Sequence, residues 1–284
     1  MSETTSEITP NSVDNPDSKI EKPAYLKWIF IGILMIGIGW MIGDMFFSTP
    51  VIPQQTVPKK GAYQLTYQDV NFDIYSVPMA QNGLKLFCLD EQKVPFRDVK
   101  TLRGYFENQH QKLVFAMNAG MYTTENLPKG LYVEQKQTLM PLDTIEKGFG
   151  NFYLQPNGVF AFDDTSAVIL ETKIFQKQIK NYNYATQSGP LLVVNNTINP
   201  VFTQDSKSLF IRNGVGITQS GKIVFVISNQ PVNFYIFAQL FKEQLHCPNA
   251  LFLDGAISKM YAPAINRFDL EGDLGPFIVL LQGH

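Results

Sequence analysis

Beyond about residue 62, apolar residues occur in short runs, several of which alternate with polar residues, and turn-forming residues separate them. Asn195-Asn196 and Ser220-Gly221 are two such turn pairs, and apolar runs bounded in this way are typical of strands joined by hairpins. The predicted strands are Tyr67–Val77, Leu84–Leu89, Leu113–Met117, Asn151–Leu154, Val159–Phe162, Ala167–Leu170, Leu191–Val194, Leu209–Ile211, Lys222–Ile227, Ala250–Leu253 and Phe277–Leu281.

Two longer segments carry apolar residues at helical spacing instead. Residues 98–110 place Val99, Leu102 and Phe106 on one face, and residues 233–246 repeat the pattern with phenylalanines and a leucine. The second segment begins with an asparagine, which is suited to cap a helix. Because a short link and a strand follow each helix, the pattern predicts an α+β fold, with a mixed, largely antiparallel sheet and packed helices.

The first 61 residues follow a different pattern. Residues 1–27 are rich in Ser, Thr, Glu, Asp and Pro and predict a disordered tail. Residues 28–47 are apolar apart from Asp44, and since about 20 residues of helix cross a bilayer, they predict one transmembrane helix. Residues 48–61 are proline-rich and predict a stalk, which lifts a domain of residues 62–284 away from the membrane.

The charges around this apolar segment predict its orientation. Lys19, Lys22 and Lys27 lie close before it, which favours a cytoplasmic N-terminus. The expected location is therefore the inner (cytoplasmic) membrane, single-pass, with the C-terminal domain in the periplasm or outside the cell. A cleaved signal peptide is the alternative, but the long polar tail and the lack of a small-residue cleavage pattern in FFSTPVIPQQ disfavour it.

Composition narrows the classes of function. The 284-residue chain has a formal net charge of −2 and no lysine/arginine cluster, which argues against nucleic acid as a partner. Two cysteines and three histidines leave little material for a metal centre, so we expect no metal and no cofactor. Asp254, Asp269 and Asp273 could hold calcium, but FDLEGDLG lacks the regular spacing of a calcium loop. Cys88 and Cys247 could pair outside the cytoplasm.

Three polar residues interrupt apolar runs near the ends of predicted strands: Asn118 in VFAMNAGM, Arg212 in LFIRNGVGI and Asp254 in ALFLDGAIS. A charge in such a place is costly unless it is paired or hydrogen-bonded, and the glycine that follows each residue allows close approach of a ligand. Together with the polar turn at residues 187–190, they predict one shared polar pocket. The simpler interpretation is a buried Arg212–Asp254 ion pair between two strands, with Asn118 capping a turn.

The order of the motifs carries a resemblance to a known family. NAGM is followed by GLYV, GNFYLQPNGVF, QSGPLLV, RNGVGI and NALFLDGAIS. This series resembles the phosphodiester glycosidase domain, and most closely its short, single-domain bacterial branch. The likeness runs from about Tyr67 to the C-terminus. It implies an α+β fold and hydrolysis of a sugar 1-phosphodiester.

The resemblance also implies, position by position, which residues form the site. The implied catalytic residues are Asp254, Arg212 and Asn118. The implied substrate-binding residues are Lys207, Ser188, Ser258 and Gly255. Lys207 is placed by its five-residue offset from the motif arginine. The family usually has aspartate, three glycines and serine where this chain has DGAIS at 254–258, so Ile257 narrows any backbone cradle for phosphate or sugar oxygens.

These residue types suit cleavage of a bond between a sugar and a phosphate. Arg212 can grip two phosphate oxygens and Lys207 can add a point charge, while Asp254 activates water or stabilises an oxocarbenium-like centre. The asparagine and the two serines would orient substrate oxygens. Glycosidases usually have a second carboxylate, and the sequence does not select one. The available carboxylates are Glu125, Glu134 and Asp143.

The predicted function is a membrane-anchored extracytoplasmic glycosidase that hydrolyses a sugar 1-phosphodiester of a phosphate-linked glycan. One alternative is a non-catalytic envelope polysaccharide-binding protein using the same pocket, which the altered glycines favour. Another is a metal-dependent phosphodiesterase, which the scarcity of histidine disfavours. The expected partners are the phosphate-linked sugar or glycan and, through the N-terminal helix, the membrane.

Overall fold

The computed structural model of the protein describes residues 61–79, 83–178, 180–254 and 257–282. The chain divides into residues 1–56 and 57–284, and everything described belongs to the second part. The predicted tail, the predicted span at 28–47 and nearly all of the predicted stalk lie outside the described residues. Within the described ranges, no helix is long and apolar enough to cross a membrane.

The largest element is a seven-stranded sheet in the order β1-β2-β13-β12-β14-β10-β11, and every neighbouring pair in it is antiparallel. Its strands are β1 (Gly61–Tyr67), β2 (Val70–Pro78), β10 (Leu191–Val194), β11 (Thr197–Ile198), β12 (Asn213–Ile217), β13 (Lys222–Ser228) and β14 (Asn249–Asp254). Strand β1 begins one residue before the predicted start of the domain.

Two five-stranded sheets, also antiparallel throughout, complete the strand structure. In the order in which they pair, the first contains β16 (Arg267–Phe268), β15 (Met260–Ala262), β4 (Leu113–Asn118), β17 (Phe277–Leu281) and β3 (Leu84–Phe87). The second contains β6 (Gln137–Met140), β5 (Tyr132–Glu134), β9 (Tyr184–Ser188), β7 (Gly158–Phe162) and β8 (Ala167–Glu171). The antiparallel prediction is confirmed, but three sheets replace the single sheet that was expected.

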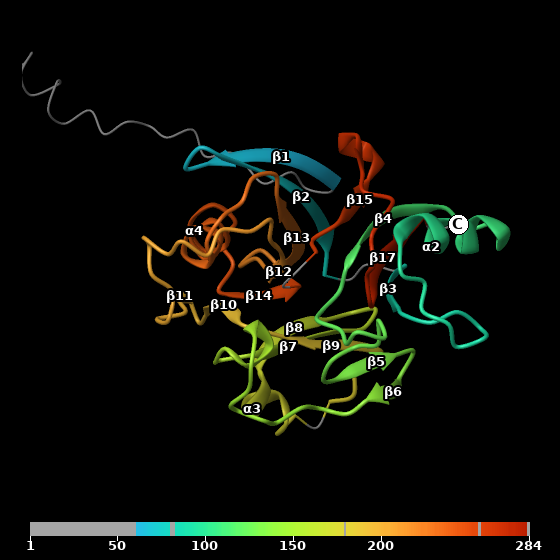
Figure 1. Cartoon of the computed structure of the whole chain (residues 1–284), viewed down its shortest axis with the longest axis horizontal. Helices are drawn as coiled ribbons and strands as arrows, with labels where there is room; N and C mark the ends of the chain where they lie inside the picture. The colour runs from blue at the N-terminus through green and yellow to red at the C-terminus, as the bar shows by residue number, and fades with distance from the viewer. Residues whose placement is uncertain (1–60, 80–82, 179, 255–256, 283–284) are drawn as a thin grey trace, which may run out of the picture. The chain divides into compact units, whose positions relative to one another are not determined.

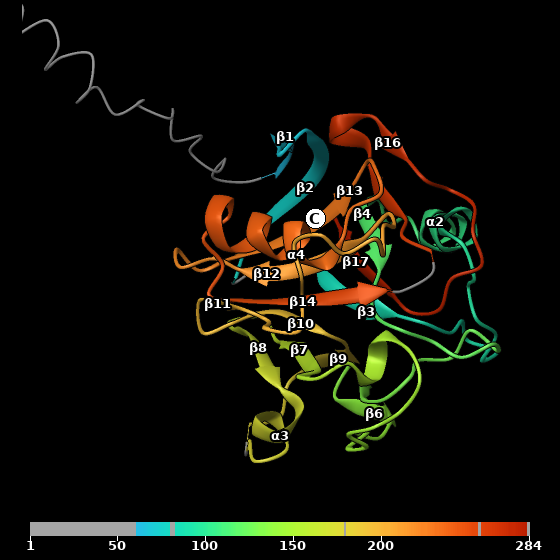
Figure 2. The same cartoon turned by 60° about the vertical axis from the view of Figure 1, so that its left-hand side comes forward.

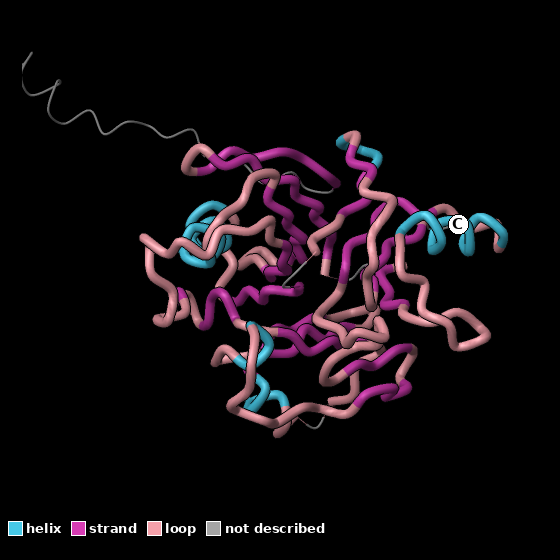
Figure 3. Tube along the Cα trace, in the orientation of Figure 1, coloured by secondary structure: helices cyan, strands magenta, loops and turns pink. Residues whose placement is uncertain are grey.

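Helices are few, and strands make up most of the regular structure (Figure 3). Both predicted helices are confirmed as α2 (Val99–Asn108) and α4 (Phe234–Gln239), the latter continued by a π-helical turn, η2 (Leu240–Gln244). Their caps follow from the sequence, because Asp98 accepts from the Thr101 amide at 2.6 Å and Asn233 from the Ile236 amide at 2.9 Å. The other helical segments are α3 (Thr172–Phe175), η1 (Asn151–Tyr153) and η3 (Pro263–Ile265).

One hydrophobic core draws on all three sheets. Its members come from strands of each sheet, with Tyr75 and Phe225 from the seven-stranded sheet, Phe115 from β4 and Phe160 from β7. The Phe115 ring lies between Tyr75 and Phe225, with centroid distances of 4.4 and 5.1 Å. Helices α2 and α4 cover outer faces on opposite sides (Figure 1), and a second view shows α4 alongside β12 and β14 (Figure 2). The three sheets therefore pack against one another around one shared core.

Strand β12 is one of the strands that the hydrophobic pattern missed, because two of its five residues are glycines. A Cβ on Gly216 would lie 2.7 Å from the Cys247 sulfur and from the Phe241 ring, and one on Gly214 would lie 3.2 Å from the Phe237 ring. The glycines of the RNGVGI motif therefore allow the helix that follows β13 to pack directly on a strand. They serve helix packing here.

Two predicted strands are wrong. Of residues 151–154, the first three form the 3₁₀ turn η1 instead of a strand, and this turn buries the Phe152 ring. Residues 209–211 make only a single bridge, between Phe210 and Val232, because Leu209 and Phe210 are exposed and Arg212 takes the buried position. A short apolar run does not distinguish these cases from a strand.

Candidate active site

The ends of four strands, drawn from all three sheets, meet at one place. Asn118 is the last residue of β4, Ser188 the last of β9 and Asp254 the last of β14, while Asn213 is the first residue of β12. Because β12 and β14 are antiparallel, Asn213 lies opposite Asp254. All four residues are buried. The fold therefore converts four positions that are distant in the chain into one polar cluster.

Asn118 is at the centre of this cluster and uses its whole hydrogen-bonding capacity. Its Nδ2 donates to the Asp254 carboxylate and, at 2.7 Å, to the Ile257 carbonyl. Its Oδ1 accepts from Asn213 Nδ2 at 2.7 Å and from the Lys259 backbone amide at 3.0 Å. A carboxamide offers two N–H donors and an oxygen with two lone pairs, so Asn118 has no group left for a substrate. It positions Asp254.

Two further bonds fix the strand that carries Asp254. The Asp254 amide donates to Asn213 Oδ1 at 3.1 Å, and the Ser188 hydroxyl donates to the Leu253 carbonyl at 2.9 Å. Ser188 and Asn213 are fully buried. The structure thus brings Asn118, Ser188 and Asp254 together as predicted, with the asparagine and the serine bound to the protein itself.

Asp254 lies on an open hollow of about 250 Å³, although only 4% of the residue is exposed. The residues that line this hollow, called the Asp254 hollow below, are Met121, Tyr122, Lys129, Phe149, Gly150, Asn151, Phe152 and Asp254. The Tyr122 hydroxyl donates to the Asp273 carbonyl at 2.7 Å. Burial, then the charges of Asp254 and Asp273, raise the pKa of Tyr122, so the phenol stays protonated at neutral pH.

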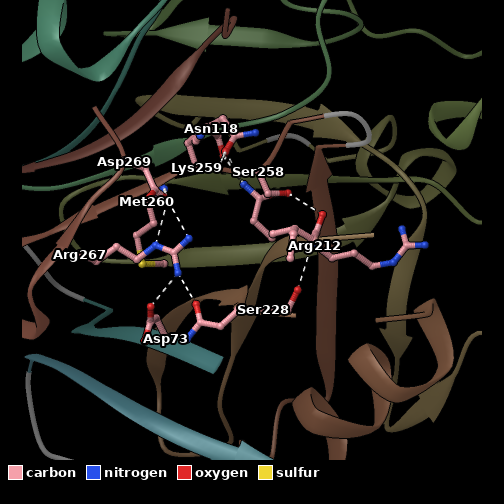
Figure 4. A network of polar contacts seen from close by, with 12 residues as sticks. Asp73, Asn118, Arg212, Ser228, Ser258, Lys259, Met260, Arg267 and Asp269 are labelled. Atoms are coloured by element: carbon pink, nitrogen blue, oxygen red, sulfur yellow. Dashed lines mark hydrogen bonds and ion pairs between the residues drawn. The ribbon is translucent and has the colours of Figure 1, made fainter. Parts of the chain in front are cut away.

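Arg212 is placed elsewhere. Its guanidinium donates from Nε to the Val232 carbonyl at 2.7 Å and from Nη2 to the Ser208 carbonyl at 2.9 Å, and it lies 3.6 Å from the centre of the Phe234 ring. In Figure 4 the side chain extends away from Asn118 and Ser258. Among the described residues, no contact of the guanidinium reaches Asn118 or Asp254, so the simpler interpretation of a direct Arg212–Asp254 ion pair is wrong. The shared pocket of Asn118, Arg212 and Asp254 stays a prediction.

The environment of Arg212 explains how a buried cation is tolerated. The residue is 1% exposed, and burial lowers its pKa to about 10, so it remains charged at neutral pH. Aromatic faces and backbone carbonyls compensate part of the charge, whereas Nη1 is buried and has no hydrogen-bond partner among the described residues. Through the Ser208 bonds, the guanidinium fixes the loop before β12.

The other predicted site residues divide in the same way. Ser258 donates from its hydroxyl to the Ile211 carbonyl at 3.2 Å, which places it beside the Arg212 backbone. Lys207 is exposed on the loop before β12, and its carbonyl accepts from the Leu209 amide at 2.9 Å. Gly255 lies outside the described residues. The catalytic and binding roles of these residues stay predictions.

The three candidate second carboxylates lie in different surroundings. Glu125 is exposed, and Asp143 accepts from the Tyr153 hydroxyl at 3.0 Å. Glu134 accepts from the Tyr132 hydroxyl at 3.2 Å, and burial raises its pKa to about 7. Such a value suits proton transfer at neutral pH, but none of the three lines the Asp254 hollow.

Two of the three acids weighed as calcium ligands form ion pairs instead. Asp269 pairs with Arg267 at 2.7 Å, and the same guanidinium bonds Asp73 at 2.8 Å (Figure 4), while Asp273 pairs with Arg97 at 2.7 Å. Within the described ranges, no cluster of three or more His, Cys, Asp or Glu side chains could hold a metal ion.

The two cysteines do not form the disulfide that was considered. Cys88 and Cys247 are buried free thiols in different hydrophobic clusters, the first in the core shared by the sheets and the second under α4.

Two residues of the site escaped the sequence analysis. Asn213 stands next to Arg212 in RNGVGI, and an interpretation centred on the charge overlooked the amide that bonds both Asn118 and Asp254. Lys129 lines the Asp254 hollow and directly precedes the GLYV motif. It interrupts no apolar run, so the search for polar residues within apolar runs did not select it. Local spacing gave no signal for this cation, because the two aromatic rings beside it, Phe152 and Tyr153, follow more than twenty residues later in the chain.

Comparison with known proteins identifies the class to which this site and fold belong. The sequence model of the phosphodiester glycosidase family matches residues 111–274, which is more than half of the chain and includes Asn118, Ser188 and Asp254. The chain therefore belongs to the phosphodiester glycosidase family.

Particular relatives are similar over part of their length. The chain is 41% identical over 154 residues to the uncharacterized protein YigE of Escherichia coli (strain K12), a match that covers 54% of this chain and 60% of YigE. The match thus spans less than two thirds of that relative. The fold is similar to the catalytic domain of zebrafish N-acetylglucosamine-1-phosphodiester alpha-N-acetylglucosaminidase, with a TM-score of 0.56, 13% identity, and coverage of 78% of this chain and 82% of that chain.

Proposed function

We propose that this protein hydrolyses a sugar 1-phosphodiester, and that Asp254 is its catalytic carboxylate. The observation that carries the proposal is the position of Asp254. This buried aspartate lies on an open hollow where strands of three sheets end, and it is oriented by the Asn118 carboxamide, whose donors and acceptors are all used. Family membership supplies the reaction class, since the matching family is that of the phosphodiester glycosidases.

The chemistry is a displacement at the anomeric carbon. Water forms the new bond to that carbon, the bond from the carbon to the phosphate oxygen breaks, and the phosphate monoester leaves with the electron pair. Asp254 accepts the proton that the water loses, or stabilises the positive charge that develops on the sugar. A phosphate is a good leaving group, so this reaction asks less of a general acid than cleavage of an ordinary glycoside.

The location belongs to the same proposal. The apolar segment 28–47 and the lysines before it support a single-pass anchor in the cytoplasmic membrane, with the glycosidase domain outside the cytoplasm. The substrate would then be a phosphate-linked glycan on that side of the membrane. This arrangement can be tested with single cysteines introduced at residue 2 and at residue 164, labelled with a thiol reagent that does not cross the cytoplasmic membrane. The proposal requires the cysteine at residue 164, and not the one at residue 2, to react in cells whose outer envelope is permeabilised and whose cytoplasmic membrane is intact.

The decisive experiment follows turnover by the full-length protein. Incubation with a sugar 1-phosphodiester in oxygen-18 water should release free sugar that carries the label, whereas label on phosphate would indicate cleavage between phosphorus and oxygen. Asp254→Asn should lower the rate at least about 100-fold. Asp164→Asn, in the exposed turn between β7 and β8, is the matched control and should leave the rate unchanged.

A binding function is the second candidate, and one observation favours it. The guanidinium of the motif arginine donates to the Val232 and Ser208 carbonyls, and Arg212 is not among the residues that line the Asp254 hollow. Binding of a phosphate-linked polysaccharide without release of sugar, by a folded wild-type protein, would select this candidate and reject hydrolysis.

A further inference from the structure

The Asp254 hollow contains a cation that the motifs did not single out. The Lys129 ammonium lies 5.1 Å from the centre of the Phe152 ring and 4.5 Å from that of Tyr153. Within the part of the chain that the structure describes, no carboxylate forms an ion pair with it. Lys129 and Asp254 line the same hollow, so the hollow has a cation and a carboxylate in its wall.

The wall that carries Lys129 is closely packed. The Tyr153 hydroxyl donates to Asp143 Oδ2 at 3.0 Å, and a Cβ on Gly148 would lie only 2.3 Å from the Tyr153 ring. The Lys129 backbone amide donates to the Met121 carbonyl at 2.8 Å. The Tyr153 ring and the Lys129 backbone are thus both held in place by the protein, and the Lys129 ammonium lies against a fixed aromatic surface.

The chemistry of the ammonium indicates what it binds. An ammonium has three N–H donors and no acceptor. The faces of the two rings attract its positive charge, but they do not replace oxygen acceptors, so its N–H groups are available to an anionic ligand. An anionic group entering beside Asp254 is repelled by the carboxylate unless a cation compensates. Lys129 can provide that compensation within the hollow, whereas the contacts of Arg212 lie elsewhere.

We propose that Lys129 binds the phosphate group of the substrate in the Asp254 hollow, the role that the motif resemblance implied for Arg212. This inference rests on the proposed function for its substrate class. It makes Lys129 a determinant of specificity, because a neutral glycoside offers it no anion. The sugar then lies between the phosphate at Lys129 and the carboxylate of Asp254.

The test is a phosphorus-31 NMR titration of the full-length protein with inorganic phosphate, combined with steady-state kinetics on a sugar 1-phosphodiester. Lys129→Met should weaken phosphate binding and raise KM by about 10- to 100-fold, the range expected for one charge-assisted hydrogen bond. Lys129→Arg keeps the charge and should retain most of the affinity. Lys180→Met is the matched control, because Lys180 also lies over a ring, Tyr182, at 4.8 Å but is paired with a carboxylate.

The outcomes separate the two proposals. Phosphate binding that depends on Lys129 in a protein that releases no sugar would sink hydrolysis and support the inference. Wild-type KM and phosphate affinity in a folded Lys129→Met variant would overturn the inference and leave hydrolysis standing. An equal loss in the Lys180→Met variant, or no binding of millimolar phosphate by the wild type, would also overturn it.

Discussion

Replacing Asn118 by aspartate tests the core of the site, because it sets a second carboxylate against that of Asp254. Both positions are buried, and two unit charges about 4 Å apart repel by about 4 kcal/mol at an effective dielectric constant of about 20. That energy corresponds to a pKa raised by about 3 units, since one unit is about 1.4 kcal/mol. One carboxyl of the pair should therefore stay protonated in the folded protein up to about pH 7.

The sign of the pH dependence follows from this raised pKa. In the unfolded chain both carboxyls ionise near pH 4, so the folded variant loses stability as the pH rises from about 4 to about 7. We expect the Asn118→Asp protein to be destabilised by about 5 kcal/mol at about pH 8, where the repulsion adds to the lost amide bond, and by only about 1 kcal/mol at about pH 4, where the lost amide bond is the remaining cost.

Urea unfolding followed by circular dichroism measures both values. Both tryptophans, Trp28 and Trp40, precede the domain, so tryptophan fluorescence would not report on its unfolding. The double variant Asn118→Asp with Asp254→Asn restores one amide and one carboxylate, and should regain most of the stability without regaining turnover. A pH-independent penalty in the single variant, or no recovery in the double variant, would refute direct contact between the two side chains.

Three other substitutions probe the fold outside the site. Burial raises the pKa of Glu134 from 4.5 to about 7, so the wild type loses stability as the pH rises across that interval. In the same urea assay, Glu134→Gln should therefore stabilise the protein by up to about 3 kcal/mol at about pH 8 and leave its stability unchanged at about pH 4. Gly216→Ala should cost about 1 to 3 kcal/mol, because its Cβ has no room; Gly104→Ala, in α2 with nothing within 4 Å, should instead add about 0.5 to 1 kcal/mol, and equal effects would contradict the packing argument.

The sequence predicts the parts of this fold that are local. The helix α2 was predictable because its cap Asp98 and its apolar face lie within one short segment, and the hairpin strands were predictable from alternation and turn pairs. The division into three sheets was not, because β4 pairs with β15 and β17, which are more than 140 residues further along the chain. No local pattern encodes that choice of partner.

The site shows the same limit. A polar residue at the end of an apolar strand correctly indicated that Asn118 and Asp254 need partners, and they became partners of each other. The same reasoning indicated that Arg212 needs compensation, but it could not show that backbone carbonyls and the Phe234 ring provide it. Carbonyls occur at every position, so they leave no mark in a sequence.

The meeting of strand ends from three sheets has a consequence for how activity can arise or be lost. A nascent or partly melted molecule that lacks any one sheet also lacks a wall of the Asp254 environment, so no fragment smaller than the assembled domain can display the aspartate correctly. The proposed hydrolysis should therefore appear in a single step late in folding and be lost when the whole domain unfolds. Partly folded molecules of this protein are therefore expected to lack the assembled Asp254 hollow.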